Sequence, residues 1–306
     1  MCDSGRMEQR RAVGFGACAV ASALWGCGFF FGKIALDEMS VGHMVLYRFL
    51  FAVVGMLPLL FTHPPRFTRR EWGVLLLASF LGVPLQFLIQ FYGLSLTTVS
   101  HASLMVGMMP VILAVGAAAF AHERMDVVGW LALAGSTSGA ALIALGHNAG
   151  SGSSVAGDLL VVVSLGIALF WILANKQLME RHSPITVTAY GLVLGTAMLL
   201  IWVPIRYGMP PVAGVSWKAW AALAASGVLC TATTTLLWNY GLTQVPASQA
   251  GILLNMEPLM GSLLGVLVLG ERLGPSAWAG GGLILVSAIT LTTRSKTRVR
   301  EQIPIT

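Results

Sequence analysis

The sequence is poor in charged residues: Asp, Glu, Lys and Arg make up 10% of its 306 residues, whereas 56% are hydrophobic. A soluble domain of this length has no core large enough to hide so much apolar surface. The four cysteines, Cys2, Cys18, Cys27 and Cys230, show neither the close pairs of a metal site nor a disulfide framework. These shortages exclude an ordinary soluble domain and leave the lipid bilayer as the expected surroundings.

Catalytic and cofactor motifs are also absent. The chain has no HExxH, no GxxxxGK[ST], and no GxSxG followed by a suitable acid and histidine, and its six histidines are scattered. The net charge of +6 would suit nucleic acid, but the basic residues are not gathered on amphipathic helices or interleaved with stacking aromatics. We therefore expect no enzyme activity, no cofactor, no metal and no nucleic-acid partner.

Long apolar runs dominate what is present. Runs of membrane-spanning length recur at 13–36, 41–62, 71–94, 98–121, 127–146, 156–179, 184–205, 217–242, 246–269 and 274–293. The first run is too long for a signal peptide, and more spans follow it. The sequence therefore predicts an all-α integral membrane protein with ten transmembrane helices.

The positions of lysine and arginine orient these helices. If both termini lie in the cytoplasm, twelve of the eighteen basic residues fall on that side, as the positive-inside rule requires. They are Arg6, Arg10, Arg11, Arg66, Arg69, Arg70, Arg124, Arg181, Arg294, Lys296, Arg298 and Arg300. We expect a multi-pass protein of the cell membrane with cytoplasmic termini.

An internal repeat appears when the two halves are aligned. At an offset of 148 residues, QFYGL at Gln90 lies over WNYGL at Trp238, and MMP at Met108 lies over MEP at Met256. An offset of 143 aligns the earlier helices and places Lys33 on Lys176. Each half would hold five helices, and because five is odd, the second half would cross the membrane in the opposite sense. Inverted repeats of this kind build secondary transporters around a site near the bilayer midplane.

The domain organisation follows from this repeat. We expect a first five-helix repeat at 1–147, a Gly/Ser linker at 148–155, a second five-helix repeat at 156–296 and a cytoplasmic tail at 297–306.

Four stretches carry a family resemblance: LWGCGFFFGK near Leu24, YRF at Tyr47, NMEPL near Asn255 and LGERL near Leu269. With them, the sequence resembles the EamA-type permeases of the drug/metabolite transporter superfamily over nearly its whole length, in two copies. The resemblance implies a ten-helix fold with a central cavity, and transport, often export, of amino acids or other small metabolites. The first half departs from the pattern, because Met109 precedes Pro110 where Glu257 precedes Pro258 in the second half.

Glu257 is the acidic residue in the middle of the ninth expected span. A charge there costs about 2.5 to 3.5 kcal/mol on insertion scales, so the side chain must face protein or a wet cavity. It lies on one helix face with Gly261 and Gly265, which favours close approach of another helix. Two interpretations stay open. In the first, Glu257 has a coupling or binding role in transport. In the second, a protonated Glu257 hydrogen-bonds the carbonyl of Leu254 or its neighbours, because Pro258 lacks an amide hydrogen and disturbs the preceding turn.

Arg48 is the basic residue deepest in an expected span. It either extends outward to lipid headgroups or lines a cavity, where its guanidinium could bind a carboxylate or phosphate. We favour the cavity and place Arg48 among the substrate-binding residues.

The remaining candidates for substrate binding are neutral. Gln86 and Gln90 form a polar stripe on the third span, with Thr234 and Trp238 as repeat partners, and Trp25 is a weaker candidate on the first span. These side chains could instead join helices by hydrogen bonds or simple packing.

Four further charges receive structural roles. Lys33 and Lys176 lie about one turn from a membrane face and are expected to reach water on their flexible stems. Glu123 and Glu271, at opposite membrane faces, are expected to be solvated or to lie at the rim of a gate.

Together these features predict a secondary transporter that works by alternating access and exports an amino acid or a related small metabolite. Its partners would be that solute, the lipid bilayer and a proton gradient. The alternatives are an exporter of lipophilic cations, for which one central carboxylate suffices, and a membrane scaffold or sensor that transports nothing.

Overall fold

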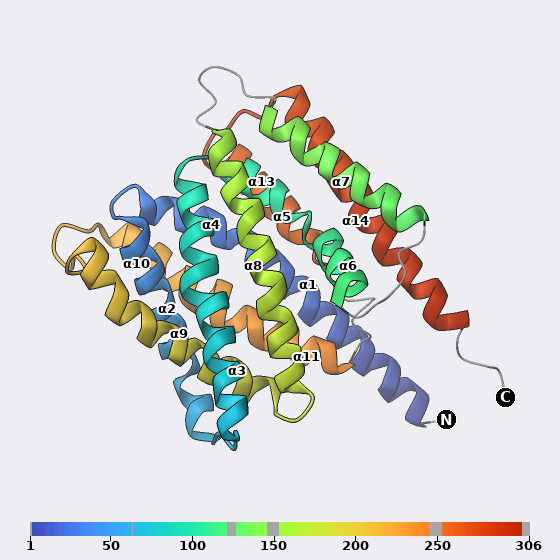
Figure 1. Ribbon diagram of the computed structural model, residues 1–306, viewed down its shortest axis with the longest axis horizontal. Helices are drawn as coiled ribbons and strands as arrows, with labels where there is room; N and C mark the ends of the chain where they lie inside the picture. Colours follow the sequence, from blue (N-terminus) through green and yellow to red (C-terminus); the bar gives the residue numbers. More distant parts are fainter. Residues whose placement is uncertain (1, 63, 121–126, 146–152, 245–252, 302–306) are drawn as a thin grey trace.

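The computed structural model describes residues 2–62, 64–120, 127–145, 153–244 and 253–301, and these fold into a bundle of helices (Figure 1). The first half contains α1 (Cys2–Leu36), α2 (Val41–Thr62), α3 (Arg69–Phe80), η1 (Leu81–Leu85), α4 (Gln86–Ser95), α5 (Val99–Val106), α6 (Met109–Phe120) and α7 (Val127–Leu145). The second half contains α8 (Val155–Met179), α9 (Pro184–Tyr207), α10 (Trp217–Ala224), η2 (Ala225–Thr233), α11 (Thr234–Gln244), α13 (Met256–Leu267) and α14 (Pro275–Glu301).

Six helical segments of the described chain are long and apolar enough to cross a membrane. They span residues 12–36, 41–62, 69–95, 155–179, 184–207 and 217–238, and three shorter apolar helices cover residues 99–112, 127–143 and 256–267. The expected linker at 148–155 lies largely outside the described residues, as do Glu123, Arg124 and the start of the expected span at 246–269.

Two of the expected spans are not continuous helices, which corrects the sequence prediction. In the first half, α5 ends at Val106, and the amides of Gly107 and Met108 form short turns to Leu104 and Met105, 3.0 Å each, before α6 begins. In the second half, a turn at 254–255 precedes α13. A proline follows each break closely, and proline removes one helical hydrogen bond, so the two breaks have the same local cause.

Two other helices contain a π-helical segment, η1 and η2. Pro84 lies in η1, where its missing amide breaks the regular bonding. In η2, the Thr231 hydroxyl donates to the carbonyl of Ser226, five residues earlier, at 3.0 Å. The 148-residue offset aligns residues 81–85 with 229–233. Since π-helical turns often lie at functional sites, this pair directs attention to the space between them.

The contacts between helices follow the repeat. The first helix of the first half, α1, packs on α11 and α13 of the second half, and its repeat counterpart α8 packs on α4 and α5 of the first. The last helices, α7 and α14, lie side by side (Figure 1). Each half therefore buries its first helix in the other half.

One close helix crossing depends on two glycines. A Cβ atom on Gly157 of α8 would lie 2.8 Å from the carbonyl oxygen of Gly93 on α4, and a Cβ on Gly93 would meet the carbonyl of Gly157 at the same distance. Such distances are too short for real side chains, so glycine at both positions lets the two backbones touch.

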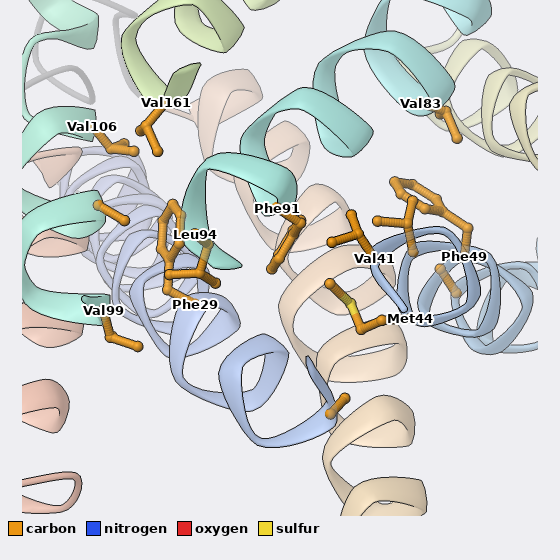
Figure 2. Packing of buried hydrophobic residues seen from close by; sticks show 14 of the residues in the cluster. Phe29, Val41, Met44, Phe49, Val83, Phe91, Leu94, Val99, Val106 and Val161 are labelled. Atoms are coloured by element: carbon orange, nitrogen blue, oxygen red, sulfur yellow. The ribbon is translucent and has the colours of Figure 1, made fainter. Parts of the chain in front are cut away.

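The apolar core includes residues of α1, α2 and α4 as well as of α5, α8 and α9. Phe49 and Phe91 are among its largest fully buried side chains, and Figure 2 shows them together with Phe29 and Met44. Phe91 also belongs to the candidate site.

Candidate functional site

Arg48 of α2 lies at the centre of the candidate site. The residue is only 4% exposed, so it does not extend to lipid headgroups. Its Nε donates to the hydroxyl of Thr231 at 3.0 Å, and Nη2 approaches the carbonyl of Cys230 at 3.5 Å. Both partners belong to η2, so the guanidinium joins α2 to the π-helical segment of the other half.

Two aromatic rings cover the same guanidinium. Its Cζ atom lies 5.0 Å from the ring centre of Phe87 and 5.1 Å from that of Phe91, both on α4. A desolvated cation–π contact is worth about 2 kcal/mol. Arginine has five N–H donors, and the protein occupies two of them. The remaining edge of the guanidinium can bind an anionic group.

Glu257 of α13 is the second charged residue of the site. Its backbone lies against Gly26 of α1, two residues before the glycine that lies against the guanidinium of Arg48. In the described part of the chain, no ion pair or hydrogen bond joins its carboxylate to a protein group. The residue as a whole is half-buried within the helix bundle.

Among the described residues, no side-chain hydrogen bond supports the capping interpretation of Glu257. The carbonyl of Leu254 accepts the backbone amide of Glu257 at 3.1 Å.

Helix α1 connects the two charged residues. A Cβ atom on Gly26 would collide with the carbonyl of Glu257, and one on Gly28 would lie 3.4 Å from Nη2 of Arg48. Glycine at these two positions brings α1 against both residues. The predicted row of Glu257, Gly261 and Gly265 does face other helices: a Cβ on Gly261 would collide with Ser103, and one on Gly265 with Ser100.

Trp25 and Trp238 form an aromatic pair next to this region. Their ring centres are 5.4 Å apart and the planes are tilted by 54°. Both residues are partly exposed, and Trp25 immediately precedes Gly26. The structure thus brings together the two tryptophans that the sequence analysis selected separately.

The neutral candidates are buried. Gln86 and Gln90 are 8% and 7% exposed, and Oε1 of Gln86 has no hydrogen-bond partner among the described residues. Thr234 is fully buried, and its hydroxyl donates to the carbonyl of Thr231 at 3.0 Å. Thr234 is therefore hydrogen-bonded to Thr231, whose hydroxyl accepts the hydrogen bond from Arg48.

Sequence reasoning missed four residues that contact Arg48: Phe87, Phe91, Cys230 and Thr231. The two phenylalanines are four residues apart on α4, each next to one of the selected glutamines. The spacing of four residues could have indicated that both rings lie on one face of the helix beside the glutamines. Aromatic pairs with this spacing are, however, also common in ordinary helix packing.

One other expectation needs correction, and a second is narrowed. Nζ of the half-buried Lys33 is not directed to water: it donates to the carbonyls of Leu94 and Thr97 at 3.1 and 2.9 Å. Glu271 is not simply solvated, because its carboxylate accepts the backbone amides of Val99 and Ser100 at 2.7 and 2.8 Å, whereas its expected position at the rim of a gate stays a prediction. Both side chains satisfy backbone groups at helix ends, where such groups have no partner within the helix. Lys176, in contrast, is exposed as expected.

The described residues contain no group of three His, Cys, Asp or Glu side chains that could hold a metal ion. The charged groups that remain available near the site are those of Arg48 and Glu257. Such an arrangement can bind and release a small polar solute with charges of both signs.

Comparison with known proteins places the chain in a family. The model of the EamA-like transporter family matches residues 13–145 and again residues 155–293. The chain therefore belongs to the EamA-like transporter family, which confirms the resemblance seen in the sequence. It is a multi-pass membrane protein of a transporter family, and membership implies a small-molecule substrate.

Individual relatives and one solved structure agree with this. The chain is 27% identical over 296 residues to a protein of Streptantibioticus cattleyicolor named probable terminal-alkyne amino-acid exporter, covering 93% of this chain and 95% of the relative. It is 30% identical over 144 residues to the threonine/homoserine exporter RhtA of Escherichia coli K12, covering 45% and 48%. A solved crystal structure has the same fold, with a TM-score of 0.64, 17% identity, and coverage of 95% of this chain and 99% of the other.

Proposed function

We propose that this protein is a secondary transporter that exports an amino acid or a related small metabolite across the cell membrane by alternating access. It would cross the membrane ten times as two inverted five-helix repeats, 1–147 and 156–296, with a linker at 148–155, a tail at 297–306 and both termini in the cytoplasm. The substrate would bind between the two repeats, in contact with Arg48 and Glu257.

The arrangement of Arg48 and Glu257 is the observation that carries this proposal. The guanidinium of Arg48 has one open edge, and the carboxylate of Glu257 has no hydrogen bond to the described residues. Helix α1 lies against the guanidinium of Arg48 at Gly28 and against the backbone of Glu257 at Gly26. An amino acid carries a carboxylate and an ammonium group on the same carbon atom. Its carboxylate can bind the open edge of Arg48 through two parallel hydrogen bonds, while its ammonium interacts with Glu257.

The aromatic pair gives the substrate a place for an apolar side chain. Trp25 and Trp238 are partly exposed beside Glu257, whereas Gln86, Gln90 and Thr234 offer neutral polar groups. Binding sites for small molecules commonly combine apolar walls with a few polar groups that fix orientation. Export of amino acids by two relatives, as their names state, supports this substrate class.

Glu257 would also couple transport to a proton gradient. A carboxylate without a protein partner can bind a proton in one state of the cycle and release it when the substrate or the opposite gate changes its surroundings. Acidic groups within membrane spans commonly serve such relays.

The proposal is tested by reconstitution in proteoliposomes. Vesicles loaded with an unlabelled amino acid should take up the same labelled amino acid by exchange, and an inward proton gradient should change its accumulation. A panel of apolar and polar amino acids, together with a lipophilic cation, defines the substrate. Transport of the lipophilic cation alone would refute the amino-acid proposal in favour of a cation exporter. Transport of no solute would favour a scaffold or sensor.

A further inference from the structure

The connection between α4 and α5, taken here as residues 94–101 so that it includes the end of α4 and the start of α5, is bound by side chains from three other parts of the molecule. The first is Lys33 of α1, whose ammonium donates to the carbonyls of Leu94 and Thr97. Leu94 lies in the last turn of α4, where its carbonyl also accepts the backbone amide of Thr97 at 3.3 Å, and Thr97 follows the end of the helix. Lys33 thus attaches α1 to the end of α4.

The second is Asp158, in the first turn of α8. Its Oδ1 accepts the hydroxyl of Thr97 at 2.6 Å, and its Oδ2 lies 3.2 Å from Nδ1 of His101. The side chains of Asp158 and His101 are 0% and 6% exposed. A buried carboxylate is costly unless it is paired, so Asp158 needs its partners Thr97 and His101. These bonds join the second repeat to the first.

The third is Glu271, between α13 and α14. One carboxylate oxygen accepts the amide of Val99, and the other accepts both the amide of Ser100 at 2.8 Å and its hydroxyl at 2.6 Å. These amides begin α5, where backbone donors have no partner within the helix. A carboxylate at this end is also favoured by the helix dipole. Glu271 therefore caps a helix of the other repeat.

The cluster consists of residues 94–101 and the side chains of Lys33, Asp158 and Glu271 that bind them. It lies farther along α1, α4 and α13 than the candidate site does. On α1, Lys33 follows Gly28 by five residues; on α4, Leu94 follows Phe91 by three; on α13, Gly265 follows Glu257 by eight. At 1.5 Å per residue these steps correspond to about 5 to 12 Å. The connection thus lies at one end of the region that contains Arg48 and Glu257.

We propose that Asp158 and Glu271 are positioning residues of the transport cycle, which hold the α4–α5 connection closed over one end of the substrate site. Both carboxylates join one repeat to the other. Motion of one repeat against the other, as alternating access requires, must therefore break their bonds. This inference rests on the alternating access of the proposed function, but it does not depend on the identity of the substrate.

A native cysteine near the site reports whether this end is open. Cys27 of α1 is half-buried and lies between Gly26 and Gly28, which contact Glu257 and Arg48. In a background with Cys2→Ser, Cys18→Ala and Cys230→Ala, a membrane-impermeant maleimide is applied to each side of oriented membrane vesicles. A separate Ser95→Cys variant, with its exposed position at the end of α4, identifies the side on which the connection lies.

The background protein should react slowly from the side of the α4–α5 connection. Asp158→Asn and Glu271→Gln should each raise the rate of labelling from that side by at least about tenfold, because losing a bond to a charged group shifts an opening equilibrium by this order. The matched control is Glu180→Gln, an exposed acid outside the cluster, and it should leave the rate unchanged.

An unchanged rate in both carboxylate variants would overturn the proposal, as would equal acceleration from both sides. If either variant fails to insert into the membrane, Thr97→Val and Ser100→Ala, which each remove one bond of the cluster, carry the same expectation. Labelling needs no substrate, so the two proposals fail separately. If the variants accelerate labelling but no amino acid is transported, the proposed substrate is refuted. If amino acids are transported but the labelling rate does not change, the proposed role of Asp158 and Glu271 is refuted.

Discussion

At the scale of single residues, Arg48 combines structural contacts with an open binding edge. Two of its donors hold η2, and two rings of α4 cover its plane, so the direction of the free edge is fixed by the protein. Preorganisation of this kind lowers the entropic cost of binding an anion. A lysine keeps the charge but loses the planar fork.

The Arg48→Lys variant should therefore bind substrate at least about tenfold more weakly, because paired hydrogen bonds to a charged group contribute about 1.5 to 3 kcal/mol each. The apparent affinity is measured from the concentration dependence of exchange in proteoliposomes. Arg69→Lys, at an exposed position of α3, is the control and should transport normally. Unchanged affinity in Arg48→Lys would remove this residue from the binding site.

Glu257 is tested by a change that keeps its size and removes its charge. Glu257→Gln should still exchange labelled for unlabelled substrate but lose the accumulation driven by a pH gradient, since a glutamine cannot take up and release a proton. Parallel measurements of exchange and of gradient-driven uptake separate the two effects. Wild-type transport that ignores the pH gradient would refute the coupling role and leave Glu257 as a substrate ligand.

At the scale of elements, the crossing of α4 and α8 depends on contact between two backbones. A methyl group on Gly157 would meet the carbonyl of Gly93 at 2.8 Å and backbone carbon of Leu96 at 3.0 Å. Neither obstacle can rotate away as a side chain could, so the helices would have to separate.

Gly157→Ala should accordingly destabilise the protein by about 1 to 3 kcal/mol, the usual cost of overpacking. Gly166→Ala on the same helix is the matched control, because a methyl group there meets nothing within 4 Å. Alanine is also the better helix former by about 1 kcal/mol, so the control should be neutral or slightly more stable. Thermal unfolding in detergent measures both, and equal midpoints would contradict the close-crossing argument.

At the scale of the whole molecule, the first helix of each half packs against helices of the other half: α1 packs on α11 and α13, and α8 packs on α4 and α5. This exchange explains why the candidate site draws on both repeats. Arg48 comes from the first repeat, whereas Thr231, Cys230 and Glu257 come from the second. Relative movement of the repeats would change the site and its ends together.

The proposed inverted arrangement makes a direct prediction about topology. Reporters fused after Arg124 should lie in the cytoplasm and those after Arg272 outside, because five helices per repeat would reverse the second half. A reporter enzyme active on only one side of the membrane measures this. The same location for both fusions would contradict the inverted repeat.

The sequence by itself determined the helices, the repeat, the family and the two unusual charges. It could do so because the bilayer demands long apolar runs, which makes both span length and an exception such as Glu257 visible in one dimension. The breaks before Met109 and Met256 were missed because the apolar composition continues through them, while the backbone bonding does not.

Only the tertiary structure decided which groups meet. Glu271 caps α5 across 172 residues of chain, Lys33 reaches the carbonyl of Thr97 across 64, and Arg48 reaches Thr231 across 183. Such partners depend on how non-neighbouring helices pack, and apolar composition is the same for many packings. The long side chains of Lys33 and Glu271 could equally have reached water. The backbone groups that bind them become available only because α4 ends, and α5 begins, next to α1 and the α13–α14 connection.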